Sequence, residues 1–199
     1  LVYFWRDVLN LLKGGVDIFR GRVTPNSRMA TYIGLATIPA LLFGAALKYS
    51  GASQMLRGAE VVAYGAIFFG VLMSVADRGG LRLKRMEDMT LGPAMLIGVA
   101  QAIALIPGTS RSGITITVAR FLGFKRGEAA RFSFLLGIPA ISAAGLFTAL
   151  DAMQHDQGIP ADALWAAFFT FFAALAAIAF LMALVRRTSF LVFVVYRIM

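Results

Sequence analysis

The sequence predicts an all-α, polytopic membrane protein, and three observations support this fold class. Hydrophobic residues make up 59% of the 199 residues and the mean hydropathy is +0.79, a composition typical of chains that cross a membrane repeatedly. Apolar runs of about 20 residues, the length that crosses a bilayer as a helix, recur along the chain. Two shorter apolar runs flank a polar turn, as in a re-entrant helical hairpin. We treat residues 1–199 as a single integral-membrane domain.

Long apolar runs define the expected spanning helices. The complete ones are Met29–Leu47, Ala59–Ala76, Glu128–Leu150 and Ala161–Val185. Pro39 and Pro139 lie inside two of them and predict kinks. We interpret Leu1–Leu12 as the end of a further span and Phe190–Met199 as the start of another. Because both ends of the sequence lie inside apolar runs, we expect it to be part of a longer chain.

The region 91–122 contains two apolar arms that are each too short to span. Leu91–Ile106 would give about 24 Å of helix and Ser112–Leu122 about 16 Å, against a hydrocarbon core of about 30 Å. Irregular backbone is tolerated at membrane depth only where protein or a water-filled cavity surrounds it. We therefore expect the arms to form a hairpin that enters and leaves on the same face.

The distribution of basic residues supports re-entry. With a re-entrant hairpin, every strongly basic loop falls on one side, which is the cytoplasm by the positive-inside rule. These residues are Lys13, Arg20, Arg22, Arg28, Arg78, Arg82, Lys84, Arg85, Lys125, Arg126, Arg186 and Arg187. Because the net charge of +9 is divided among these short clusters, we expect no nucleic-acid partner.

The number of crossings predicts an inverted repeat. Three expected spans precede the hairpin and three follow it. Because a re-entrant hairpin does not cross the membrane, a unit of one hairpin and three spans crosses it an odd number of times. Two such units in tandem are inverted, as in many transporters. We therefore expect a first hairpin upstream of Leu1, entering from the opposite face. The tripeptide Ile38–Ala40 is repeated at Ile138–Ala140, but three residues are too few to support this symmetry.

The turn between the two arms has the composition of an anion-binding site. Pro107 ends the incoming helix, and Gly108 permits backbone angles closed to other residues. Thr109, Ser110 or Ser112 can cap the next helix, whose N-terminus favours an anion.

Arg111 is the most informative residue of this turn. A charge at the bilayer centre costs about 2.5–3.5 kcal/mol on insertion scales, and such residues are usually functional. Its guanidinium fork suits phosphate oxygens, and Thr115 shares its helix face. The alternative is a capped turn in which Arg111 pairs with a backbone carbonyl. Gln101, in the first arm, could contact the ligand or hydrogen-bond another helix, and the second role is the commoner one.

Other catalytic chemistry has little support in the sequence. The chain has no cysteine, and its single histidine, His155, lies in a polar loop. We expect no metal ligands among these 199 residues, because no Asp, Glu or His falls inside the expected membrane segments near the turn.

Three stretches are similar to the undecaprenyl-diphosphate phosphatase family of bacterial membranes. They are QAIALIPGTSRSGITIT, GEAARFSFLLGIPA and RRTSFLVFVVYRI. The family motif PGxSRSxxT is matched at Pro107, Gly108, Ser110, Arg111, Ser112 and Thr115. The similarity covers essentially the whole chain. It implies hydrolysis of a C55 isoprenyl diphosphate to the carrier lipid for peptidoglycan synthesis, bacitracin resistance, and a multi-pass location in the bacterial inner membrane.

The family's other motif, a Glu-rich stretch followed by Pro-x-Ser-Ser and a His, is absent from these residues. The resemblance implies a divalent cation, Mg or Ca, whose ligands would belong to that motif. We therefore expect the 199 residues alone to be inactive. A homodimer is left open.

The resemblance and the turn together suggest roles for individual residues. Arg111 would neutralise the diphosphate and stabilise the transition state, and Ser110 would donate to a phosphoryl oxygen or act as nucleophile. Five residues would bind substrate: Gln101, Gly108, Thr109, Ser112 and Thr115. The alternative function is a polyprenyl-phosphate carrier or flippase that uses the same anion site without hydrolysis.

Overall fold

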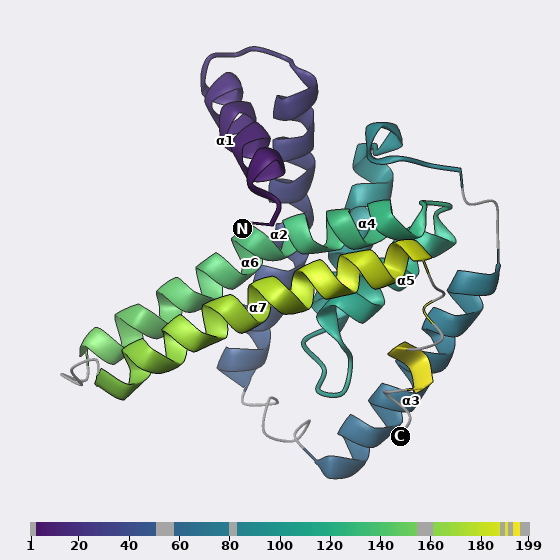
Figure 1. The fold of residues 1–199 in the computed structure, drawn as a ribbon. Helices are drawn as coiled ribbons and strands as arrows, with labels where there is room; N and C mark the ends of the chain where they lie inside the picture. The colour runs from purple at the N-terminus through teal and green to yellow at the C-terminus, as the bar shows by residue number, and fades with distance from the viewer. Residues whose placement is uncertain are drawn as a thin grey trace.

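The computed structural model describes residues 3–50, 58–79, 83–154, 161–187, 190 and 193–195, and most of them are helical (Figure 1). The helices are α1 Trp5–Phe19, α2 Pro25–Ser50, α3 Ala59–Arg78, the 3-10 helix η2 Met86–Asp88, α4 Leu91–Ile103, α5 Arg111–Phe121, α6 Arg126–Gln154 and α7 Ala161–Arg187. In the described part of the chain, α2, α3, α6 and α7 are long and apolar enough to cross a membrane. The predicted class, an all-α polytopic membrane protein, is confirmed.

The four predicted spans correspond to α2, α3, α6 and α7, and the two predicted arms to α4 and α5. The predicted end of the first helix at Leu12 is wrong, because α1 continues to Phe19. Its polar residues recur on one face, so α1 is amphipathic and escapes a search for uniformly apolar runs. The predicted helix at 190–199 and His155 lie largely or wholly outside the described residues.

Helix α1 folds back on α2. Gly14 permits the close approach, since a Cβ there would overlap the backbone of Asn26 in α2. The connection is fixed by Thr24, whose Oγ1 donates to Asp17 Oδ2 at 2.8 Å and whose backbone N–H donates to Ser27 Oγ at 2.8 Å.

Helices α4 and α5 form the predicted helical hairpin, and its two ends are joined at the base. The N–H of Lys84 donates to the carbonyl of Gly123 at 3.1 Å, and the N–H of Lys125 donates to the carbonyl of Lys84 at 3.0 Å. The chain therefore enters and leaves the hairpin at the same end of the molecule. Re-entry into a membrane and the inverted repeat stay predictions.

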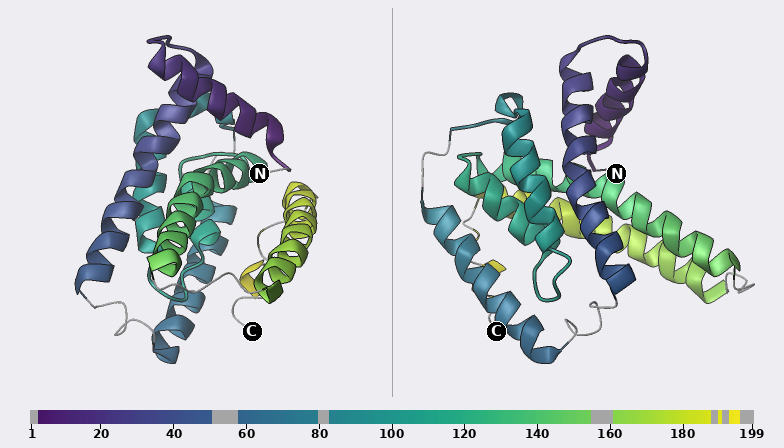
Figure 2. Two further views of the ribbon diagram at one scale, coloured as in Figure 1. Left: turned by 90° about the vertical axis from the view of Figure 1, so that its left-hand side faces the viewer. Right: turned by 180° about the vertical axis from the view of Figure 1, so that it is seen from behind.

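The hairpin is held between α2 and α3 (Figure 2). On one side, Gly98 of α4 lies directly against the backbone of Ala36 in α2. On the other side, α5 packs on α3. Small residues at these crossings allow helix backbones to approach closely, as is usual between helices in membranes.

A buried ion-pair cluster fixes the base of the bundle. Asp77, at the end of α3, accepts two hydrogen bonds of 2.7 Å from Arg126 at the start of α6. Arg120, at the end of α5, lies 3.1 Å from the same carboxylate, which also accepts from the N–H of Phe190. Because Asp77 joins α3, α5 and α6, it fixes the end of α5 that is opposite Arg111.

The outer surfaces of the long helices are apolar. Helices α6 and α7 run antiparallel (Figure 1). Helix α7 exposes large aromatic side chains, which are Trp165, Phe168, Phe169, Phe171, Phe172 and Phe180. An apolar surface of this kind is expected where helices contact lipid.

Candidate functional site

The N-terminus of α5 lies at the tip of the hairpin and is capped by Ser110. The Oγ atom of Ser110 accepts a hydrogen bond from the N–H of Gly113 at 3.1 Å. The residue is exposed, and accepting this bond leaves the hydroxyl proton free to be donated. The helix dipole also places partial positive charge at this end. The tip is therefore suited to an anion.

Gly108 is required by the geometry of the turn. Its φ is +87°, in the region that favours glycine, and a Cβ there would overlap the backbone of Val62 in α3. The tip thus rests directly on α3, where Gly65 provides room for the carbonyl of Pro107. This contact fixes the position of the anion-binding turn relative to the long helices.

Arg111 lies in a notch on α6. A Cβ at Gly137 would overlap its guanidinium group, so the glycine provides the space that the guanidinium occupies. The Nη1 atom is buried, yet none of the described residues accepts a hydrogen bond from it. In the alternative considered above, Arg111 pairs with a backbone carbonyl. No carbonyl of the described residues accepts a hydrogen bond from Nη1.

Two other buried polar side chains at this turn also lack partners among the described residues. Both Nε2 and Oε1 of Gln101 are unsatisfied, as is Oγ1 of Thr109. Gln101 is only 2% exposed, so its amide is removed from bulk solvent. Buried polar groups are hydrogen-bonded in the great majority of cases, and exceptions call for an unseen water, ion or ligand. Gln101 lines the same cavity as Arg111, and these two side chains indicate a polar binding site.

Arg111 and Gln101 open onto an apolar cavity of about 730 Å³. Its walls come from α2, the end of α4, and α6; they include Ala40, Leu41, Leu42, Gly44, Ala45, Tyr49, Ala104, Leu105, Ala140, Ile141, Ala144 and Phe147. Pro39 and Pro139 immediately precede two of these residues, so both predicted kink positions flank the cavity. A cavity with a cationic end and apolar walls is suited to an amphiphile with an anionic head.

Thr115 joins α5 to α6. Its hydroxyl lies 2.6 Å from Ser133 Oγ in α6 and 2.8 Å from the carbonyl of Arg111, and the residue is 1% exposed. These contacts give Thr115 a part in the packing of α5 on α6, and its contact with substrate stays a prediction. Ser112, in the first turn of α5, is half-buried and stays a candidate ligand.

Two functional contributors, Gly137 and Ser133, were missed by sequence reasoning. Both lie on the face of α6 that packs on α5, and each contacts a residue of the PGxSRSxxT motif. No local pattern marks them, since a glycine two residues before a proline and a serine between phenylalanines are ordinary in a membrane helix. Only the packing of α5 on α6 shows what they do.

The described residues do not fit a divalent cation. Within the described ranges, no group of three or more His, Cys, Asp or Glu side chains could hold a metal ion. The polar groups around Arg111 are an amide, hydroxyls and the guanidinium itself, whereas Mg²⁺ and Ca²⁺ are usually held with the help of carboxylates.

The fold and the site define an integral-membrane protein with a helical hairpin that carries a buried arginine beside an apolar cavity. The chain belongs to the bacitracin resistance protein BacA family, which it matches over residues 1–199.

Relatives from several bacteria agree with this assignment. The undecaprenyl-diphosphatase of Ruegeria pomeroyi is 44% identical over 100% of this chain and 75% of the relative. That of Erythrobacter litoralis is 40% identical over 100% of this chain and 77% of the relative. Undecaprenyl-diphosphatase 1 of Rhodospirillum rubrum is 39% identical over 100% of this chain and 71% of the relative.

Replacing Gln101 by Leu is expected to stabilise the protein in the absence of ligand. The change removes a buried amide without partners, which costs about 1–3 kcal/mol when left unsatisfied. Thr115→Val is the matched comparison and should destabilise by about 1 kcal/mol or more, because it leaves Ser133 without its partner. Thermal unfolding in detergent measures both. Equal destabilisation by the two changes would show that the Gln101 amide is satisfied.

Proposed function

We propose that this chain is a membrane phosphatase that hydrolyses undecaprenyl diphosphate to undecaprenyl phosphate and phosphate. The observation that carries the proposal is the buried Nη1 of Arg111, which has no hydrogen-bond partner among the described residues and lies at the end of an apolar cavity. The names of the relatives support the same reaction. They do not favour a carrier or flippase that would use the site without hydrolysis.

The shape of the site separates the two parts of such a substrate. The diphosphate would lie at the tip, between Arg111, the Gln101 amide and the N-terminus of α5. The isoprenyl tail would follow the apolar walls, where Leu42 of α2 and Phe147 of α6 are both largely exposed to the cavity and its surroundings. Burial of apolar surface contributes about 25 cal/mol per Å², so the tail supplies much of the affinity.

Hydrolysis here requires positioning and neutralisation of charge. Water attacks the terminal phosphorus, the bond to the bridging oxygen breaks, and that oxygen leaves with the lipid monophosphate. Arg111 would bind the phosphoryl oxygens and stabilise the charge that shifts between them in the transition state. Ser110 would donate its free proton to a phosphoryl oxygen, and a nucleophilic role for its Oγ is the alternative.

The setting of the reaction completes the proposal. We place the protein in the bacterial inner membrane with the base of the hairpin, which carries Lys84, Lys125 and Arg126, on the cytoplasmic side. Recycling of the carrier lipid for cell-wall synthesis and resistance to bacitracin follow from the proposed reaction. The divalent cation implied by the family stays a proposal, and its ligands are not assigned to the described residues. The homodimer also stays a prediction.

Arg111→Ala in the full-length gene product is expected to reduce hydrolysis by about 10²–10³-fold, the usual effect of removing one preorganised donor to a transition-state oxygen. Arg111→Lys should recover little, because an ammonium lacks the guanidinium fork. Phosphate release from a detergent-solubilised prenyl diphosphate is the assay. Arg28→Ala, which removes an exposed arginine of α2, is the control. Near-normal turnover of the Arg111→Ala variant would contradict the assignment.

Gly137→Leu is expected to reduce hydrolysis although residue 137 bears no functional group. The new side chain takes the space of the Arg111 guanidinium, and a misplacement of about 1 Å in an active site can cost about 10²-fold. Gly145→Leu is the control, because nothing lies within 4 Å of a Cβ at that position of the same helix. If both variants kept full activity and normal unfolding temperatures, the space that Gly137 leaves for the Arg111 guanidinium would not be required for hydrolysis.

A further inference from the structure

The apolar cavity beside Arg111 has small side chains on two of its walls. On α2, Ala40 and Gly44 lie four residues apart and line the cavity. On α6, Ala140 and Ala144 repeat this spacing and line it as well. Residues four apart share one face of a helix, so each wall presents a shallow strip rather than a row of large side chains. The two strips leave room between α2 and α6 for a chain of carbon atoms.

Small side chains alone do not make a binding site, but the polar end of this cavity indicates a ligand. Gln101 lines the cavity, is 2% exposed, and has no hydrogen-bond partner for Oε1 or Nε2 among the described residues. Such buried polar groups call for a ligand or a water molecule. An amphiphile whose anionic head lies at Gln101 and Arg111 would have its tail in the space between α2 and α6.

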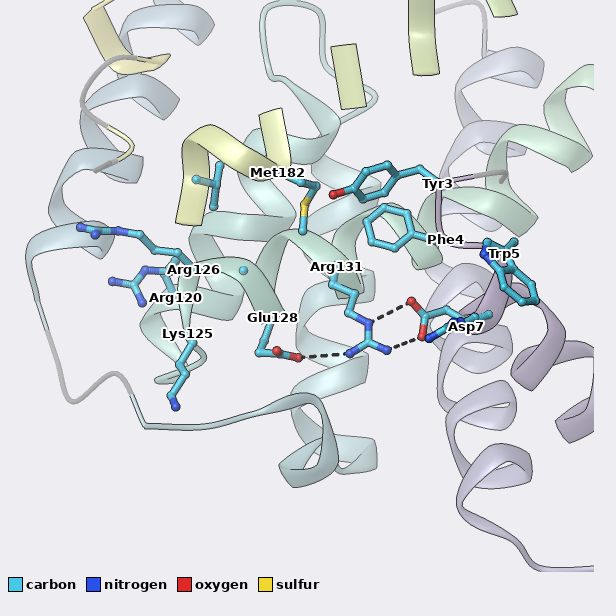
Figure 3. Close-up of a pocket in the computed structure, with 13 residues that line it drawn as sticks. Tyr3, Phe4, Trp5, Asp7, Arg120, Lys125, Arg126, Glu128, Arg131 and Met182 are labelled. Atoms are coloured by element: carbon cyan, nitrogen blue, oxygen red, sulfur yellow. Dashed lines mark hydrogen bonds and ion pairs between the residues drawn. The ribbon is translucent and has the colours of Figure 1, made fainter. Parts of the chain in front are cut away.

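A second cavity, at the base of the bundle, offers no comparable place for a tail (Figure 3). Arg131 of α6 lies between two carboxylates there, with its Nε 3.0 Å from Asp7 Oδ2 and its Nη1 3.8 Å from Glu128 Oε2 (Figure 3). Arg120 also lines this cavity, at the end of α5 that is opposite Arg111. A tail bound there would meet charged side chains, and its head would lie at the wrong end of α5.

The length of the apolar walls limits how much of a tail the protein can contact. The lining residues of α6 begin at Ala140 and end at Phe147, a rise of about 10 Å at 1.5 Å per residue. An isoprene unit adds four carbon–carbon bonds, or about 5 Å, to an extended tail. The walls therefore contact about two isoprene units, and most of a C55 tail lies beyond them.

The far end of the cavity is open to the surroundings of the helices. Leu42 of α2 and Phe147 of α6 both line the cavity, and they are 67% and 68% exposed. Exposed apolar side chains on the outer surface of spanning helices are expected to contact lipid. A tail that passes these two residues continues into lipid, where further isoprene units gain no apolar burial from the protein.

We propose that the protein selects its substrate by the diphosphate and about the first two isoprene units, and is indifferent to the rest of the tail. This inference rests on the proposed function and adds a specificity to it. Ala144 of α6 and Ala45 of α2 are the residues that set the limit, because both line the cavity and are exposed. A larger side chain at either position would occupy the space of the second unit.

Hydrolysis of dimethylallyl, geranyl and geranylgeranyl diphosphates by the full-length gene product tests the proposal. Ala144→Phe should lower kcat/KM for the geranyl substrate about tenfold more than for the dimethylallyl one, since about 55 Å² of apolar contact is lost at about 25 cal/mol per Å². The additional loss for the geranylgeranyl substrate should be no greater than for the geranyl one. It should appear in KM, because the tail is bound equally in the ground and transition states.

Each comparison is made between variant and wild type on the same substrate, so partition of the substrate into detergent cancels. Ala149→Phe is the control, because Ala149 is exposed on the same helix and does not line the cavity. If Ala144→Phe unfolds, Ala45→Phe on α2 replaces it. Its control is Ala46→Phe, at an exposed neighbour that does not line the cavity.

Three results would overturn the inference while leaving the proposed function intact. An equal loss for all three substrates would mean that the variant acts on the head or the fold. A loss that keeps growing through the geranylgeranyl substrate would mean that the protein contacts more of the tail. Equal effects of Ala144→Phe and Ala149→Phe would mean that the tail lies elsewhere. Release of phosphate from none of the substrates by the wild type would instead overturn the proposed function, and this inference with it.

Discussion

The guanidinium of Arg111 must be kept at the end of an apolar cavity where no described residue accepts a hydrogen bond from its Nη1 atom. Such a group is costly unless a ligand or water completes it, so the surrounding structure has to hold it in place. Gly137 provides the space, the cap at Ser110 sets the direction of α5, and the Thr115–Ser133 contact joins α5 to α6. The anionic headgroup of the proposed substrate would satisfy what these contacts leave open.

The rest of the fold supports the hairpin that carries this group. Its base is closed by the hydrogen bonds between Lys84 and the segment after α5, and Asp77 joins the ends of α3, α5 and α6. Its tip rests on α3 through Gly108. A short hairpin fixed at both ends can hold irregular backbone deep in the bundle, because protein rather than lipid surrounds it. The long helices then provide the apolar surface for a lipid tail.

Elements that depend on length and composition could be predicted from the sequence. The four long helices and the two short arms follow from the number of consecutive apolar residues, and the tip follows from Pro107, Gly108 and the charge of Arg111. Features that depend on which faces meet could not be predicted. The continuation of α1 to Phe19 is an amphipathic pattern rather than an apolar run, and the roles of Gly137 and Thr115 arise only where α5 packs on α6.

We propose that the hairpin tip binds an anion from water although both arms are apolar. The chain has no native cysteine, so a cysteine introduced at Ser112 labels only the tip, and one introduced at Phe168 on α7 serves as the control. We expect Ser112→Cys to react with a membrane-impermeant thiol reagent and a prenyl diphosphate analogue to slow this reaction, while Phe168→Cys stays unreactive. No reaction at Ser112→Cys from either face of the membrane, with or without the analogue, would contradict it.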